Sequence, residues 1–246
     1  MNHFNNPTIK QDQADMIYRN SDRFLTAFNR IEKVLKSFLI KKEMGFSRAV
    51  KVLSKSNAMI KQYQDDLLEF AELRNAIVHN KTDLMYTIAE PHDSVVERIE
   101  VIEMELLEPR KVDPLFIRKV IYFQQTESLS NVLEIVNQHG ITKFPVYKGN
   151  VFQGLITHKG ITKWFSKGIG KRLTTLLNAK LVEVLECEKS DNFRFISRET
   201  SVYEAKEIFK EQIGKGNRLE ALLITSEGNA NGSLVGIVTN WDIMEI

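Results

Sequence analysis

A short motif that occurs twice is the feature that most constrains the fold. The sequence GIVTNWD covers residues 236–242, and a related sequence, GLITHKG, covers residues 154–160, which lies 82 positions earlier (236 − 154). Both copies place a glycine, two apolar residues and a threonine before a short polar stretch, but only the second copy ends in an aspartate. A motif that returns in this way indicates an internal duplication, so the segments around it should repeat as well.

Those segments do repeat, in the order strand, helix, strand, strand, helix. The first set reads KVIYF, SLSNVLEIVNQHG, FPVYKG, FQGLIT and HKGITKWF, and the second reads FRFIS, SVYEAKEIFKEQIG, EALLITSEG, GSLVGIVT and NWDIMEI. Their alignment pairs Phe123 with Ile196, Leu129 with Val202, Pro145 with Leu222, Gly154 with Gly236, and Thr157 with Thr239. Each half is too small to bury its sheet alone, so two βαββα modules should pack as a pair, the first in residues 112–166 and the second, with the linker before it, in residues 167–246.

Before residue 109 the apolar residues follow a helical period. They recur every three or four positions from Phe24 to Leu39 and from Ile60 to Ile77. A further segment, PHDSVVERIEVIEMELL, opens with a proline and an Asp-Ser pair that suit a helix start. We therefore predict an α+β protein of two domains, an all-α helical bundle in residues 1–108 and the βαββα pair in residues 109–246.

Composition narrows the class of protein. The chain has 246 residues, of which 43% are hydrophobic and 27% are charged, a balance typical of globular domains. The single cysteine, Cys187, excludes an internal disulfide and a Cys-rich zinc site, and we expect it to be structural. The first residues lack the pattern of a signal peptide, and no apolar run approaches the ~20 residues that cross a bilayer. We expect a cytoplasmic protein without a membrane partner.

The net charge of +2 gives no argument for a nucleic-acid partner, but the charge is unevenly distributed. Residues 30–61 contain nine Lys or Arg against two Glu, and residues 90–108 contain seven acidic residues against Arg98. Two interpretations fit this pattern. The basic and acidic faces compensate one another within one domain, or the basic segment forms a phosphate-binding surface.

The duplicated βαββα unit, ending in G-h-h-T-x-x-D (h, apolar), resembles the cystathionine-β-synthase (CBS) domain. That domain normally occurs as a tandem pair, and many members bind adenosine-containing ligands in clefts between the two modules. The resemblance covers residues 112–246 and includes Gly236, Thr239 and Asp242. It implies that the Thr239 hydroxyl contacts a phosphate and that the Asp242 carboxylate accepts the ribose hydroxyls. The implied regulatory ligand is AMP, ADP, ATP or cyclic di-AMP, with neither a catalytic cofactor nor a metal.

Elementary chemistry is compatible with that site. A helix that begins after Thr239 would present free N–H groups to an anion. The apolar strand residues Ile196, Ala221 and Leu222 could enclose a purine. An alternative needs no ligand, because Thr239 and Asp242 are also suited to capping the last helix.

The first copy of the motif keeps Thr157 but has Gly160 where the second has its aspartate. His158 and Lys159 offer positive charge beside Thr157, which would suit further phosphates of a longer nucleotide or of a cyclic dinucleotide. The alternative is a solvated helix start. In either case the two clefts should not be equivalent. The tryptophans at the ends of the two modules, Trp164 and Trp241, are expected to be packing residues.

The helical half contains Arg74, Asn75 and His79 in the pattern R-N-x-x-x-H at the end of an amphipathic helix. With the later segment IAEPHDSVVERIE it resembles the Swt1-like branch of the HEPN (higher eukaryote and prokaryote nucleotide-binding) superfamily, over residues 15–108. Many HEPN members are metal-independent ribonucleases, and others are dimerisation or binding scaffolds. In an alternative interpretation, His79 and Asn80 merely end the helix.

A ribonuclease of this kind needs a base for the 2′-hydroxyl and a cation for the charge that develops on phosphorus. Arg74 and His79 lie about 140° apart on a regular helix, so a composite site would need two chains. We therefore expect a homodimer that senses an adenosine nucleotide through its CBS pair, with the helical domain as its dimerisation or output part. The alternative is a nucleotide-regulated ribonuclease with RNA as its substrate.

Overall fold

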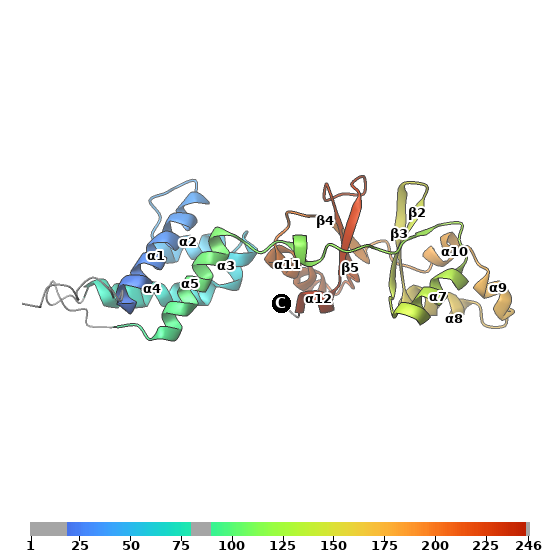
Figure 1. The fold of residues 1–246 in the computed structure, drawn as a ribbon, viewed down its shortest axis with the longest axis horizontal. Coiled ribbons are helices and arrows are strands. Elements are labelled where there is room, and N and C mark those ends of the chain that lie inside the picture. Colours follow the sequence, from blue (N-terminus) through green and yellow to red (C-terminus); the bar gives the residue numbers. More distant parts are fainter. Residues whose placement is uncertain (1–18, 80–89, 245–246) are drawn as a thin grey trace, which may run out of the picture. The chain divides into compact units, whose positions relative to one another are not determined.

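Helices alone form the described part of the N-terminal region, and two small sheets with their helices form the rest. The computed structural model describes residues 19–79 and 90–244. The chain divides into two compact units, residues 1–109 and 110–246. Figure 1 shows the helical unit in blue to green and the mixed unit in green to red.

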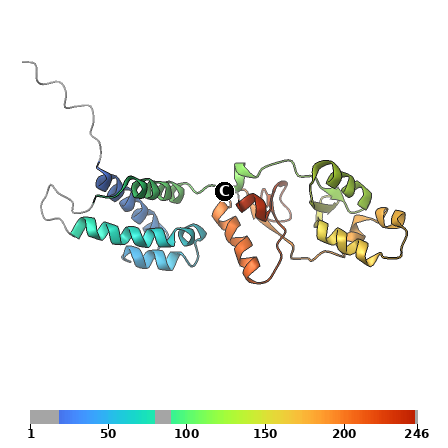
Figure 2. The same cartoon turned by 90° about the horizontal axis from the view of Figure 1, so that it is seen from below.

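In the N-terminal unit, α1 packs against α5 and α2 packs against α4, as both cartoon views show (Figures 1 and 2). The helices of its described residues are α1 (Asn20–Ser37), α2 (Phe46–Leu53), α3 (Ala58–Gln62), α4 (Gln64–His79) and α5 (Asp93–Leu107). Aromatic side chains lie at the centre: Phe24 contacts Phe70 edge-on, and Phe28 stacks on Phe46 with ring centroids 4.3 Å apart. This core explains the helical period of the apolar residues, because they face one another across the bundle.

The second predicted helix is two helices. The backbone at Tyr63 leaves the helical region, with φ −104° and ψ 15°, and this residue separates α3 from α4. Asn57 starts α3, since its side chain accepts hydrogen bonds from the N–H groups of Met59 and Ile60. The apolar period continues across the break, so periodicity alone could not show it.

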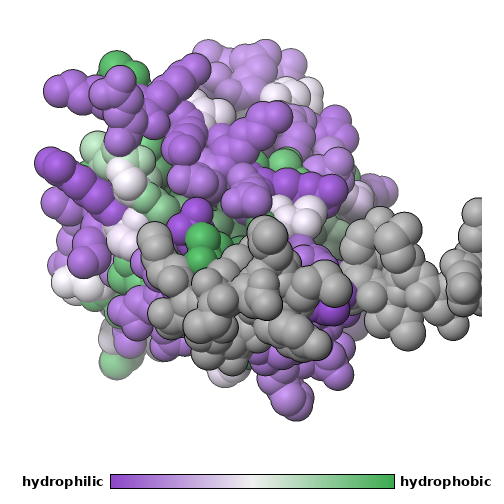
Figure 3. Space-filling model, turned by 90° about the vertical axis from the view of Figure 1, so that its left-hand side faces the viewer, coloured by the Kyte–Doolittle hydropathy of each residue, from purple (hydrophilic) through white to green (hydrophobic). Residues whose placement is uncertain are grey.

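Basic and acidic side chains compensate one another within this unit. Arg23 on α1 binds Glu100 on α5 at 2.7 Å, and Arg30 binds Glu103 at 3.1 Å. These pairs favour the first interpretation of the uneven charge. Because most of their side chains are at least one-third exposed, water screens these pairs and they contribute little to stability. The end of this unit that faces the viewer in Figure 3 is mostly hydrophilic, as expected for a solvated surface.

The C-terminal unit has the predicted order of strand, helix, strand, strand, helix, present twice. Its elements are α6 (Val112–Leu115), β1 (Phe123–Gln124), α7 (Leu129–His139), β2 (Lys143–Lys148), β3 (Val151–Thr157), α8 (His158–Lys167), α9 (Leu173–Leu177), α10 (Leu181–Leu185), β4 (Phe193–Ser197), α11 (Val202–Gly214), β5 (Ala221–Thr225), β6 (Leu234–Val238) and α12 (Asn240–Met244). Each module has one three-stranded sheet, in the order β1-β2-β3 or β4-β5-β6. The first two strands of each sheet are parallel and the last two are antiparallel.

The strand registers confirm two pairs of the predicted alignment of the modules. Phe123 and Gly154 both pair with Val146, whereas Ile196 and Gly236 both pair with Ile224. Phe123 therefore matches Ile196, and Gly154 matches Gly236, as predicted.

The predicted match of Pro145 with Leu222 is wrong by one residue. Pro145 pairs with Leu155, and the equivalent pair in the second sheet is Leu223 with Ile237. The connection from α11 to β5 is longer than that from α7 to β2, so counting from the helices could not fix this register.

One apolar cluster joins the two sheets. Leu155 from the first module packs with Ala221 and Leu223 from the second, and all three side chains are buried. The ring of Phe152 lies edge-on against Phe193, with centroids 4.8 Å apart. The two modules thus share a core, which is the expected solution for sheets too small to be buried separately.

Candidate functional site

The segment before the first strand lies directly against β6. Ile117 forms an antiparallel bridge with Gly236, and the Arg118 N–H donates to the carbonyl oxygen of Val235 at 3.1 Å. A Cβ atom built on Gly236 would overlap the carbonyl oxygen of Phe116. The motif glycine therefore allows a close backbone approach, and this approach sets the position of Arg118.

Arg118 meets the aspartate at the other end of the motif. Its Nη2 donates to Asp242 Oδ1 at 3.1 Å and to the carbonyl oxygen of Ile237 at 2.8 Å. Asp242 Oδ2 accepts from the N–H of Thr239 at 2.7 Å and from its hydroxyl at 2.6 Å. The Asp242 N–H donates back to the Thr239 hydroxyl at 3.4 Å. The helix cap that the sequence left as an alternative is thus present, and one carboxylate oxygen also binds a cation.

These contacts decide the charge of Asp242. Burial by itself would raise the pKa of the carboxyl, but the hydrogen bonds from Thr239 and the charge of Arg118 together outweigh burial and lower the pKa. The half-buried carboxylate is therefore held in its ionised form.

A cavity of about 360 Å³ opens beside this cluster, within the range of small-molecule sites. Its lining comes from the segment before β1, the turn between α7 and β2, and the end of β6 with α12: Arg118, Lys119, Val120, Ile121, Gly140, Ile141, Thr142, Lys143, Ile237, Thr239, Trp241 and Asp242. Both modules contribute to it. The predicted pair Thr239 and Asp242 therefore lies in the wall of a cavity.

Positive charge predominates in this wall. The described lining residues include the cations Arg118, Lys119 and Lys143 and a single carboxylate, that of Asp242. Because Asp242 already accepts hydrogen bonds from Arg118 and Thr239, its charge is largely compensated. The cavity is thus suited to an anion. The described part of α12 is only five residues long, so the side-chain cations supply the positive charge here.

The apolar part of the wall differs from the predicted one. Ile196, Ala221 and Leu222 are at most 5% exposed and belong to the module cores. They lie outside the lining because their strands are covered on the faces that carry them. Ile237 and Trp241 line the cavity instead.

The two tryptophans, both predicted to be packing residues, have different roles. Trp164 packs against the first module's core, and its Nε1 donates to the carbonyl oxygen of Leu176. Trp241 lines the cavity and is 78% exposed, so the prediction of a packing role is wrong for this residue. Trp241 lies in the first turn of α12, a short helix that buries Ile243, and its own side chain faces solvent. Sequence reasoning also missed Arg118, whose only signal was an Arg-Lys pair before the first strand.

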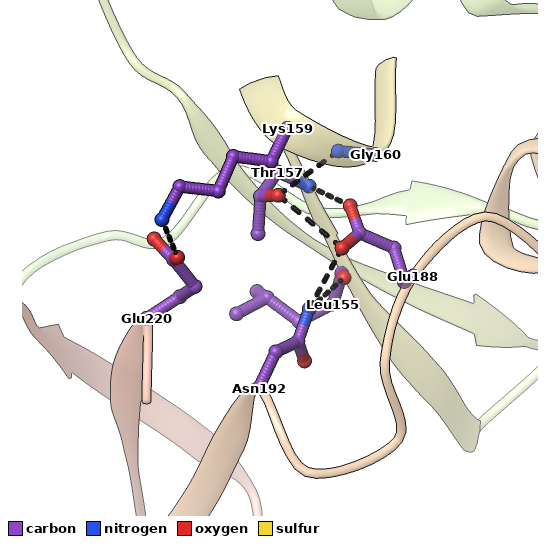
Figure 4. Close-up of polar contacts among 7 residues, drawn as sticks. All are labelled: Leu155, Thr157, Lys159, Gly160, Glu188, Asn192 and Glu220. Atoms are coloured by element: carbon purple, nitrogen blue, oxygen red, sulfur yellow. Dashed lines mark hydrogen bonds and ion pairs between the residues drawn. The ribbon is translucent and has the colours of Figure 1, made fainter. Parts of the chain in front are cut away.

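The equivalent place in the first module has the same bonding pattern with a different carboxylate (Figure 4). Glu188 Oε1 accepts from the N–H of Thr157 at 2.5 Å, and Oε2 accepts from its hydroxyl at 3.2 Å. The Gly160 N–H donates to the Thr157 hydroxyl at 3.3 Å. Asn192 Nδ2 donates to Glu188 Oε2 at 3.0 Å and to the carbonyl oxygen of Leu155 at 3.1 Å.

The remaining predicted residues of the first copy lie at the edge of this cluster. His158 is exposed, and Lys159 forms an ion pair with Glu220 of the second module (Figure 4). Burial raises the pKa of Glu188 despite its hydrogen bonds from Thr157 and Asn192, and the nearby charge of Glu220 raises it further. Thr157 is completely buried, whereas Thr239 is only partly buried and lines a cavity.

In the N-terminal unit, Arg74 and Asn75 line a hollow of about 320 Å³ together with Arg48. Arg74 Nη1 donates to Asn75 Oδ1 at 3.4 Å. The helix α4 ends at His79, but the side chain of His79 and the whole of Asn80 lie outside the described residues. The structure therefore gives no geometry for an Arg-His pair.

Residues 110–246 thus form a duplicated βαββα pair with a ligand-sized cavity at the second copy of its motif. Residues 112–167 and 188–246 match the model of the CBS domain, and this unit is a tandem pair of CBS domains. The matched residues do not include the N-terminal unit, for which the HEPN resemblance stays a prediction. A search of curated proteins found no match to the chain.

Solved structures resemble the chain over somewhat more than half of its length. A putative acetoin utilization protein (AcuB) from Vibrio cholerae is 16% identical, with 55% of this chain and 87% of that chain covered and a TM-score of 0.43. CBSX2 in complex with AMP is 14% identical, with 55% and 94% covered and a TM-score of 0.41. The CBS domain of a bacterial CNNM/CorC family Mg²⁺ transporter in complex with ATP is 14% identical, with 59% and 89% covered and a TM-score of 0.40.

Within residues 19–79 and 90–244, no helix has both the length and the apolar character needed to cross a membrane.

Proposed function

We propose that the CBS pair binds an adenosine nucleotide in the cavity beside Thr239 and Asp242 and that the protein has a regulatory role. The observation that carries this proposal is the composition of the cavity wall. Three cations, one of them paired with the single carboxylate, and apolar side chains meet around about 360 Å³. A nucleotide needs that combination, because it has an anionic part, a sugar with hydroxyls and an apolar base.

The wall suggests a role for each part of the site. Arg118, Lys119 and Lys143 provide the charge for phosphates, and Arg118 can also bind two oxygens at once. Asp242 Oδ1 keeps a free lone pair beside Arg118 and can accept a ribose hydroxyl. The ring of Trp241 offers an exposed surface for the base. The Thr239 hydroxyl donates to Asp242, so a phosphate contact by Thr239 would require this hydroxyl to rotate.

The test is a thermal-shift panel of AMP, ADP, ATP, S-adenosylmethionine and cyclic di-AMP, followed by calorimetry with the best ligand. A ligand at a hundred times its Kd stabilises the folded state by about 2.7 kcal/mol, which such a panel detects. No shift with any of the five would contradict the proposal.

Asp242→Ala should weaken binding of that ligand by roughly 1.5–3 kcal/mol, about tenfold to more than a hundredfold, because a charged hydrogen-bond acceptor is lost. Lys159→Ala is the control, since Lys159 lies in the other copy of the motif and pairs with Glu220. Calorimetry on both variants decides the matter. Equal losses would contradict the assignment of the site, and full affinity in Asp242→Ala would leave this carboxylate only a helix cap.

For the N-terminal unit we propose a dimerisation or output role, with nucleotide-regulated RNA cleavage as the alternative. The hollow that Arg48 and Arg74 line is the observation that favours keeping this alternative, since two guanidinium groups suit a phosphodiester. Cleavage of single-stranded RNA in the presence of EDTA, lost in both Arg74→Ala and His79→Ala, would support it. Intact RNA under all conditions would leave the scaffold role.

A further inference from the structure

The two threonines of the duplicated motif have the same hydrogen-bond pattern. In each module one carboxylate accepts both the N–H and the hydroxyl hydrogen of the threonine. In each module the hydroxyl oxygen also accepts the N–H of the residue three positions later, Gly160 or Asp242. The difference lies in where the carboxylate comes from. In the second module it belongs to the motif, and in the first it comes from Glu188, after α10.

Gly160 is the residue that makes room for Glu188. A Cβ atom at Gly160 would overlap the Glu188 carboxylate. Any other side chain at this position, aspartate included, would therefore displace Glu188 from Thr157. Glu188 can therefore bind Thr157 only because the first copy has a glycine, and not an aspartate, at position 160 (Figure 4).

The surroundings of Thr157 are closed and carry a different charge from the cavity at Thr239. Thr157 is 0% exposed and Asn192 is 4% exposed, and Asn192 holds both Glu188 and the Leu155 carbonyl. Glu188 has the carboxylate of Glu220 near it, and Lys159 is paired with that same Glu220 (Figure 4). Each threonine thus has a carboxylate on it, but Asp242 is paired with Arg118, whereas Glu188 has the carboxylate of Glu220 near it. A phosphate that approached Thr157 would be repelled by both glutamates.

We propose that Glu188 takes the place of the missing aspartate and keeps nucleotides out of the first cleft, so that each chain binds one nucleotide, in the cavity beside Asp242. The stoichiometry rests on the function proposed above. The internal role of Glu188 does not, because it follows from the contacts of Thr157 and Gly160.

Calorimetry with ATP on the full chain tests the stoichiometry, with the best ligand of the panel replacing ATP if ATP gives no shift. We expect one equivalent per chain, and the Asp242→Ala variant should lose this single binding event. Two equivalents in the parent protein, or one undiminished event in Asp242→Ala, would overturn the proposal. If no nucleotide binds, the proposed function fails, and the unfolding experiment below still tests Glu188.

That experiment is a double-mutant cycle between Gly160 and Glu188, in which the Tm of each variant is measured by thermal unfolding without ligand. Gly160 lies inside α8, where alanine is intrinsically preferred to glycine. In the parent protein, Gly160→Ala should nevertheless lower the Tm, because it displaces Glu188 and leaves the Thr157 N–H and hydroxyl without an acceptor. In the Glu188→Ala background, the same substitution should leave the Tm unchanged or raise it.

Gly214→Ala is the matched control, because a Cβ at Gly214 meets nothing within 4 Å. Its effect should be the same in both backgrounds. If Glu188→Ala does not fold, Glu188→Asp replaces it, since the shorter side chain keeps the charge and gives space to the new Cβ. An equal fall in Tm on Gly160→Ala in both backgrounds would overturn the proposed role of Glu188.

Discussion

Two carboxylates that accept hydrogen bonds from equivalent threonines have opposite pKa shifts. The hydrogen bonds of Thr239 and the charge of Arg118 lower the pKa of Asp242 against the effect of its burial. Glu188 is more enclosed and has Glu220 near it in place of an arginine, so burial prevails and its pKa is raised. The neighbouring charge thus distinguishes the two sites more than the threonine contacts do.

These shifts predict opposite dependences of stability on pH. Because folding lowers the pKa of Asp242, its ionised carboxylate stabilises the folded protein at pH values above the ordinary pKa of 3.8. This stabilisation is lost as the pH falls through the folded-state pKa. Because folding raises the pKa of Glu188, its protonated carboxyl stabilises the folded protein at pH values below the ordinary pKa of 4.5. This stabilisation is lost as the pH rises through the folded-state pKa.

Relative to the parent protein, Asp242→Asn should therefore be most destabilised above pH 3.8, and Glu188→Gln should gain stability as the pH rises from 4.5. Thermal unfolding of the three proteins over this range measures both differences. The same pH profile for the two variants would contradict the assignment.

Residues that are distant in sequence were the ones that sequence reasoning missed. Thr239 and Asp242 were predictable because three positions separate them and the motif is duplicated. Arg118 lies 124 residues from Asp242, and Glu188 lies 31 residues from Thr157, so no local spacing connects them. Trp241 was misassigned for a related reason, because exposure depends on the packing of the whole helix and not on the type of side chain.

At the scale of elements, the helices and strands followed from periodicity, and their exact ends did not. The apolar period predicted α1, the proline and Asp-Ser pair at its start predicted α5, and the repeated order of segments predicted α7 and α11; each of these helices buries one face. Periodicity could not show the break at Tyr63, and of the strand predicted over KVIYF only Phe123 belongs to β1 (Phe123–Gln124). Ile117 and Arg118, just before the predicted strand, lie beside β6, where the Arg118 N–H is bonded to the Val235 carbonyl oxygen.

That contact makes Gly236→Ala a test of the second module. The added methyl would press on the Phe116 carbonyl, and backbone cannot yield as a flexible side chain does. We expect a loss of roughly 1–3 kcal/mol in the free energy of unfolding, together with weaker nucleotide binding because Arg118 is displaced. Urea unfolding and calorimetry provide the two measurements.

Gly214→Ala, which adds a methyl to open space near the end of α11, should change stability by no more than about 1 kcal/mol, in the stabilising direction, and leave binding intact. Unchanged stability and affinity in Gly236→Ala would show that the segment before β1 is not held against β6.

For the whole molecule, the duplicated motif predicted the fold of the C-terminal unit, but it gave no information on the function of the N-terminal unit. In the N-terminal unit, α5 has apolar side chains on two faces. Ile99, Ile102 and Leu106 are buried in the bundle, whereas Val101, Met104 and Leu107 are 43%, 63% and 53% exposed. Exposed apolar groups at a helical spacing commonly mark a contact surface.

The expected homodimer can be tested at this outer face of α5. Light scattering at tens of micromolar should give twice the chain mass of 28.4 kDa. Met104→Lys should shift the mass toward that of the monomer, because a charge would be buried between two copies. Glu69→Lys, at an exposed position on α4, should leave the dimer intact. A monomeric parent protein would contradict the dimerisation role and would also exclude a composite Arg-His site, since such a site needs residues from two chains. A dimer that survives Met104→Lys would place the contact on another surface and leave the outer face of α5 unexplained.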